Sequence, residues 1–182
     1  MTKETKIPYS KIKITLALVG SFCFVTLGIL TLLDENGFST LMFPSETLNK
    51  GVSVLGILFF GTIALALPYK LSSNKFGLEI NERGIIDNSN LSSVGLVEWK
   101  DIKEIRVQSF NTTSWLLVYT YYPKKYIEKA QSRFKKWRLN SNVKSYGTPI
   151  YITSTVLNVN FTELEKLVME AFENKKTHYN NR

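Results

Sequence analysis

The chain has very little of the chemistry that metal centres and disulfide scaffolds need. Its 182 residues include one cysteine, Cys23, and one histidine, His178. One cysteine cannot form an internal disulfide, which excludes a disulfide-stapled secreted scaffold. A single histidine and a single cysteine are also too few for a His/Cys metal site. We therefore predict neither a metal nor a cofactor.

Patterns typical of an enzyme active site are missing as well. The sequence contains no glycine-rich phosphate-binding loop and no zinc-ligand spacing. His178 lies in the polar C-terminal tail, and Cys23 lies in an apolar run, where a thiolate is disfavoured. Acidic residues after Pro68 stand singly in a basic background, which is typical of a solvated surface. We predict no catalytic residues and no enzyme activity, with a cryptic membrane-bound enzyme as the less favoured alternative.

Charge is absent from two long apolar runs, Ile14–Leu33 and Gly51–Leu67. At about 1.5 Å per residue, the first run is about 30 Å long, which is the hydrocarbon thickness of a bilayer. It has no small-residue cleavage site, and Phe22 precedes Cys23 where a lipoprotein signal needs a small residue. Neither run contains Asp, Glu, Lys, Arg or His, whereas ion and proton pathways usually need such groups inside the membrane. We predict two membrane-spanning anchor helices; the alternative is a pair of buried core helices.

Basic residues around these runs predict the orientation. The loop between them, Asp34–Lys50, has one basic residue at its far end, whereas four lysines precede the first run: Lys3, Lys6, Lys11 and Lys13. By the positive-inside rule, both termini lie in the cytoplasm and the loop lies outside. We expect small residues on the first run to let the two helices approach closely: Ala17, Ser21 and Gly28.

Residues after Pro68 have the pattern of a soluble domain. Alternating apolar residues and turn residues predict a series of short strands: 77–81, 84–87, 97–99, 105–107, 114–122 and 149–153. We expect Gly84 to supply a positive φ in the first hairpin turn. A closing amphipathic helix is expected after Asn160, which caps it together with Glu163, while Val159 packs on Leu164. Strands followed by one helix predict an antiparallel sheet or partial barrel capped by that helix.

Three stretches carry a resemblance to pleckstrin-homology-like (PH-like) domains: FGLEINERGIID, GLVEWKDIKEIRV and YGTPIYITSTVLNVNFTELEKLVMEAF. Together with the two apolar runs, residues 8–174 resemble a family of bacterial proteins with two transmembrane helices and a cytoplasmic PH-like domain. That resemblance implies a fold and a membrane location, not an activity. The phosphoinositide-binding pattern of eukaryotic PH domains is not met, because Ile85 stands where its final arginine would be.

The predicted organisation is α+β, with a transmembrane helical hairpin before the PH-like domain. Its parts are a cytoplasmic tail (1–13), a transmembrane helix (14–33), an external loop (34–50), a second transmembrane helix (51–67), a linker (68–75), the PH-like domain (76–174) and a polar tail (175–182).

The segment 124–138 is the most basic part of the chain, with seven basic residues and one acidic residue. At 100° per residue, one inserted helix would place an apolar arc beside a basic arc. The apolar arc is formed by Tyr126, Ile127, Ala130, Phe134 and Trp137, and the basic arc by Lys125, Lys129, Arg133 and Lys136. A basic amphipathic helix is typical of a membrane-surface or partner-binding element. The alternative is that the apolar arc lies on the domain's own sheet and the lysines are solvated; the two interpretations are compatible.

These features predict a membrane-anchored interaction or scaffolding module in the bacterial inner membrane. Its expected partners are the bilayer, anionic lipid headgroups bound by the four basic residues, and another membrane protein. An accessory subunit of a membrane complex is the alternative function. We expect no nucleic-acid partner, because membrane tethering already accounts for the positive charge.

Overall fold

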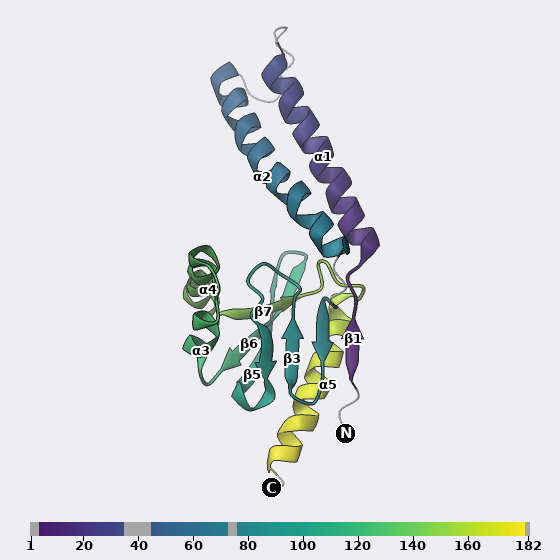
Figure 1. Cartoon of the computed structure of the whole chain (residues 1–182), viewed down its shortest axis with the longest axis vertical. Helices are drawn as coiled ribbons and strands as arrows, with labels where there is room; N and C mark the ends of the chain where they lie inside the picture. The colour runs from purple at the N-terminus through teal and green to yellow at the C-terminus, as the bar shows by residue number, and fades with distance from the viewer. Residues whose placement is uncertain (1–3, 35–44, 73–75, 181–182) are drawn as a thin grey trace. The chain divides into compact units, whose positions relative to one another are not determined.

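The chain forms two compact units in the computed structural model, which describes residues 4–34, 45–72 and 76–180 (Figure 1). Unit 2 is Lys11–Asn74, and unit 1 consists of Met1–Ser10 together with Lys75–Arg182. Unit 2 is therefore inserted into the chain of unit 1.

Unit 2 contains two long apolar helices, α1 (Lys11–Leu33) and α2 (Glu46–Ser72). Both are long and apolar enough to span a membrane, and almost none of their apolar stretches is buried. α2 begins before Gly51 and continues through Pro68, so much of the segment expected to be a linker is helical. Most of the expected external loop, residues 35–44, lies outside the described residues.

The two helices contact each other through small and aromatic residues. A Cβ added to Gly28 would lie 2.8 Å from Cγ1 of Ile57, so the absence of a side chain permits this approach. The rings of Phe24 and Phe60 stack with centroids 4.3 Å apart. Ser21 is buried, whereas Ala17 is exposed.

Unit 1 contains two antiparallel sheets, β1–β2–β3–β4 and β5–β6–β7. Their strands are β1 (Thr5–Ile7), β2 (Leu78–Ile80), β3 (Gly84–Asp87), β4 (Gly95–Glu98), β5 (Ile102–Phe110), β6 (Thr113–Thr120) and β7 (Ile150–Thr153). A short 3₁₀ helix, η2 (Trp99–Asp101), joins the two sheets in the chain. The expected strands are all present, and the α+β class is confirmed.

Strand β1 lies in the segment that the sequence analysis assigned to the N-terminal tail. It pairs with β2 in the register Thr5↔Ile80 and Ile7↔Leu78. The residues that follow also belong to unit 1, because the Ser10 amide, one residue before α1, donates to Val156 O at 2.8 Å. Unit 1 therefore includes β1 and is not confined to residues 76–174.

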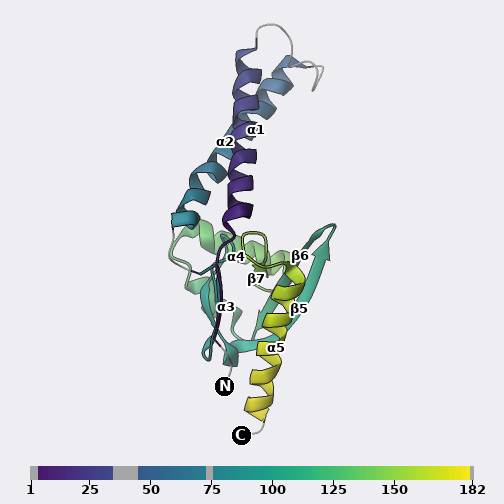
Figure 2. The ribbon, with the colours of Figure 1, turned by 90° about the vertical axis from the view of Figure 1, so that its right-hand side faces the viewer.

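The core of unit 1 lies between the sheets and α5 (Phe161–Asn180), which crosses the opening between them in Figure 2. Trp99 is 4% exposed and Phe172 is 8% exposed, and both belong to the buried cluster. The predicted helix cap is confirmed, since the Glu163 amide donates to Asn160 Oδ1 at 2.8 Å. α5 thus covers the core, as expected for a closing helix.

Gly84 has a different role from the one predicted. Its φ is not positive; the described glycines with positive φ are Gly95 and Gly147. A Cβ at Gly84 would instead lie 2.0 Å from the carbonyl oxygen of Val97 on the paired strand. Glycine is required here for the close approach of two strands.

Candidate functional site

The basic segment 124–138 forms two helices and not the single helix predicted. α3 (Pro123–Glu128) ends before a short connection, and α4 (Arg133–Tyr146) continues past the expected end. Ser132 has extended backbone angles, φ −133° and ψ 153°, and its hydroxyl accepts a hydrogen bond from the Lys135 amide. This N-cap starts a new helix at Arg133 and breaks the continuous basic arc.

α3 is held to unit 1 by a carboxylate of η2. Asp101 is almost fully buried, and its Oδ2 accepts hydrogen bonds from Lys125 Nζ at 2.6 Å and from Tyr126 Oη at 2.7 Å. Lys125 Nζ also donates to Glu98 Oε2 at 3.1 Å. Tyr126 is fully buried and accepts a hydrogen bond from the Glu98 amide at 3.2 Å.

The electrostatics of this cluster stabilise fixed charge states. Burial raises the pKa of the Asp101 carboxyl, but the hydrogen bonds from Lys125 and Tyr126 lower it by more, so it lies below the ordinary value. Burial and the bond to Asp101 raise the pKa of the Tyr126 phenol. Hydrogen bonds to Asp101 and Glu98 raise the pKa of the Lys125 ammonium. At neutral pH the Asp101 carboxylate is therefore anionic, the Tyr126 phenol neutral and the Lys125 ammonium cationic. Fixed charge states of this kind indicate a structural link and not a proton relay.

The four basic residues predicted to bind lipid are therefore separated by the break. Lys125 is engaged with two carboxylates, and Lys129 lies with its ammonium 4.8 Å from the ring centroid of Tyr126. Arg133 and Lys136 lie on α4 and are exposed. The structure does not bring the four together as one arc.

α4 presents two aromatic side chains to the solvent. Phe134 is 63% exposed and Trp137 is 65% exposed, and their rings stack with centroids 5.9 Å apart. Leu139 is fully buried, and at 100° per residue it lies on the opposite side of the helix from both rings. The guanidinium of Arg138 lies 5.9 Å from the Phe134 ring centroid.

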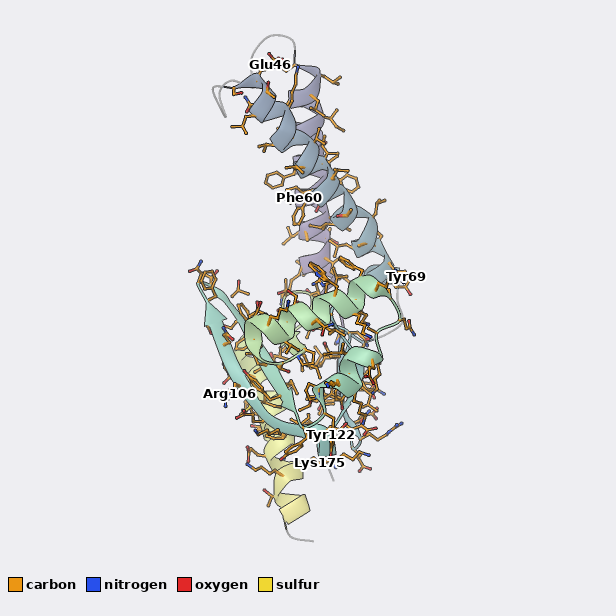
Figure 3. All side chains as sticks on the ribbon, turned by 90° about the vertical axis from the view of Figure 1, so that its left-hand side faces the viewer. Glu46, Phe60, Tyr69, Arg106, Tyr122 and Lys175 are labelled. Carbon is orange, nitrogen blue, oxygen red and sulfur yellow. The ribbon has the colours of Figure 1, made fainter. Side chains whose placement is uncertain are left out.

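Hydrogen bonds fix the inner side of α4 against the rest of unit 1. Arg138 Nε donates to Ser92 Oγ at 3.2 Å, and Asn142 Nδ2 donates to Pro149 O at 3.1 Å. Figure 3 shows α4 across the face of unit 1 that lies opposite α5. The apolar arc predicted for 124–138 is thus divided, since Tyr126 is in the core while Phe134 and Trp137 point outward. We call Phe134, Trp137, Arg133 and Lys136 the α4 surface.

A second feature escaped the sequence analysis altogether. A pocket of about 260 Å³ is lined by four lysines, which come from η2, β5 and α5: Lys100, Lys103, Lys175 and Lys176. Its apolar lining includes Trp99, Tyr121 and Phe172. These residues are far apart in sequence, so only the folded chain reveals the pocket. We call it the four-lysine pocket.

The residues considered for catalysis form no constellation in the described part of the chain. Cys23 is exposed on α1, and no group of three or more His, Cys, Asp or Glu side chains in the described ranges is arranged to hold a metal ion. Comparison with protein-family models, with curated proteins and with solved structures finds no match.

Proposed function

We propose that the protein is a non-enzymatic, membrane-anchored interaction module whose unit 1 is PH-like and contacts anionic lipid headgroups through the α4 surface. Four- and three-stranded antiparallel sheets closed by a C-terminal helix support the PH-like assignment. The same features support the resemblance to bacterial proteins with two transmembrane helices and a cytoplasmic PH-like domain.

The pairing of β1 with β2 supports a membrane arrangement with two crossings and unit 1 on one side. These strands flank α1 and α2 in the chain and are hydrogen-bonded to each other in one sheet. If the helices cross a bilayer, the chain must leave unit 1 and return to it on the same side, which takes an even number of crossings. The exposed apolar surfaces of α1 and α2 supply two crossings. The lysine bias before the first apolar run supports a cytoplasmic position for unit 1. The resemblance to bacterial proteins supports an inner-membrane location.

The composition of the α4 surface supports lipid contact. Trp and Phe side chains favour the boundary between headgroups and acyl chains, and Arg and Lys beside them attract anionic lipids. Of the four basic residues, we assign lipid contact to Arg133 and Lys136. Lys125 instead pairs with Glu98 and Asp101, and Lys129 lies against the ring of Tyr126. Each basic residue near an anionic leaflet contributes about 1 kcal/mol of attraction.

A protein partner is the second candidate for the α4 surface. Exposed Trp and Arg side chains are also typical of interface hot spots, so an accessory subunit of a membrane complex would use the same residues. Anionic lipid is favoured for two reasons. The α4 surface is basic, and unit 1 is joined to both ends of unit 2, which we propose to span the membrane. Two pockets in the described part of unit 1 contain lysines and a single carboxylate: the four-lysine pocket, and a pocket lined by Lys124, Lys125 and Glu128. This lining supports binding over acid–base catalysis.

The lipid contact is tested by quenching of tryptophan fluorescence in the full-length protein. We expect brominated acyl chains to quench Trp137 in bilayers that contain phosphatidylglycerol, less so in pure phosphatidylcholine, and less at high salt. The signal of Trp137 is the difference between wild type and Trp137→Phe. The double variant Arg133→Gln/Lys136→Gln should weaken the docked state by about 30-fold, because two contributions of about 1 kcal/mol are lost.

A matched control removes the same charge elsewhere on unit 1. Arg106→Gln/Lys166→Gln also replaces one arginine and one lysine, both exposed and outside the α4 surface. Its quenching should equal that of wild type. If Trp137 is not quenched in either bilayer, or if the two double variants lose quenching equally, the α4 surface does not contact anionic lipid.

A further inference from the structure

The four-lysine pocket brings positive charge from separate parts of the chain around one cavity. Lys100 and Lys103 come from η2 and β5, while Lys175 and Lys176 follow the buried Phe172 on α5. No Asp or Glu is among the residues that line this pocket. A concave site with four cations and no lining carboxylate is complementary to an anion.

Most of this charge is not neutralised by the residues that the structure describes. Lys100 forms an ion pair with Glu98 at 3.2 Å, and Glu98 is shared with Lys125. Within the described residues, Lys103, Lys175 and Lys176 form no ion pair at or below 4.0 Å. Neighbouring like charges repel one another, and a bound anion would relieve that repulsion.

The lining beneath the lysines is aromatic and largely fixed. Trp99 and Phe172 are core residues, and the Trp99 indole nitrogen donates to Asn81 O at 2.8 Å. Tyr121 is 59% exposed, so its ring remains accessible to a ligand. An exposed ring beside cations suits a ligand that joins a charged group to a flat or apolar group. Figure 3 labels Lys175 and Tyr122, the neighbour of Tyr121 in the chain.

We propose that the four-lysine pocket binds a compact anion that carries phosphate groups. Lysine is a common phosphate ligand, because its ammonium is a point charge with three donors and needs no planar geometry. The volume of about 260 Å³ lies just below the usual range for small-molecule sites, about 300–1,000 Å³, which favours a compact ligand. The pocket shares no residue with the α4 surface, so this inference goes beyond the proposed lipid contact.

The phosphate can come from a soluble metabolite or from the headgroup of a phosphomonoester lipid. Inorganic pyrophosphate is the probe for the soluble source, and phosphatidic acid in the bilayer is the probe for the lipid source. Full-length protein is placed in nanodiscs of phosphatidylcholine and titrated with pyrophosphate by calorimetry, without divalent metal. We expect saturable binding that weakens as salt is added.

The decisive variant is Lys103→Gln/Lys175→Gln/Lys176→Gln, which leaves the paired Lys100 in place. It should weaken pyrophosphate binding by at least about tenfold, since three charge-assisted contacts are lost. The control Arg106→Gln/Lys144→Gln/Lys166→Gln has the same net charge and should bind within about twofold of wild type. Replacing the three pocket lysines with arginine should retain binding, and unchanged melting temperatures exclude misfolding as the cause of any loss.

Phosphatidic acid then identifies the source. If the lipid headgroup enters the pocket, its addition to the nanodiscs raises the apparent dissociation constant for pyrophosphate in wild type and in the control variant. If a soluble anion is the ligand, phosphatidic acid does not compete; both results retain the site. Absence of saturable pyrophosphate binding, or equal affinity in the pocket and control variants, overturns the proposal.

Discussion

Replacing Phe172 with alanine is expected to lower the free energy of unfolding of unit 1 by about 3–5 kcal/mol. Phe172 is 8% exposed and lies on the inner side of α5, in the same buried cluster as Leu164 and Val168. Truncation removes buried apolar surface and leaves a cavity beneath α5. Urea unfolding of the full-length protein in detergent, followed by near-ultraviolet circular dichroism, measures the change.

Phe134→Ala is the matched control, because it removes the same ring from an exposed position on α4. Its free energy of unfolding should stay within about 0.5 kcal/mol of wild type, as for most surface substitutions. Equal stabilities for Phe172→Ala and wild type would show that α5 does not close the core.

Asp101→Asn is expected to destabilise unit 1 by about 3 kcal/mol at neutral pH. The substitution preserves the shape of the side chain but removes the charge that accepts from Lys125 and Tyr126. Tyr126→Phe should cost less, about 1–3 kcal/mol, because Lys125 still pairs with Asp101 while the amide of Glu98 loses its acceptor. Thermal or urea unfolding across pH measures both effects.

The effect of Asp101 should depend on pH in one direction. Its folded-state pKa lies below the ordinary value, so its contribution is fully present above the unfolded-state pKa of about 3.9. The contribution is lost as the pH falls through the folded-state pKa, because the carboxyl is then protonated in both states. The difference between wild type and Asp101→Asn should therefore shrink below about pH 4. A difference that does not change between neutral and acidic pH would contradict the charged role of Asp101.

Local patterns in the sequence identify most of unit 1 correctly. Apolar alternation marks β2 and β3, the aromatic and β-branched run marks β6, and the Asn160 cap marks the start of α5. β1 lacks such a signal, because its three residues are too few to show an alternation of apolar and polar side chains. Its partner, β2, follows the whole of unit 2 in the chain, so only tertiary pairing defines it.

The spacing of apolar and basic residues along the chain is not enough to predict the candidate sites. Residues that favour helix dominate segment 124–138. The local sign that one helix ends and another begins is Ser132, a good N-cap residue directly before the first residue of α4, Arg133. That cap separates the buried Tyr126 from the exposed Trp137, which the single-helix prediction placed in one arc. The four-lysine pocket joins η2 to α5, and no local pattern in either segment predicts that meeting.

Site-directed cysteine labelling tests whether the two helices cross the membrane and whether unit 1 lies in the cytoplasm. Reporter cysteines are introduced in a Cys23→Ala background at Ser39, in the segment between the helices, and at Thr112, exposed in the β5–β6 turn of unit 1. An impermeant maleimide should label Ser39→Cys in intact spheroplasts and should label Thr112→Cys only after the membrane is permeabilised. Labelling of Thr112→Cys in intact spheroplasts, or protection of Ser39→Cys until permeabilisation, would contradict this topology.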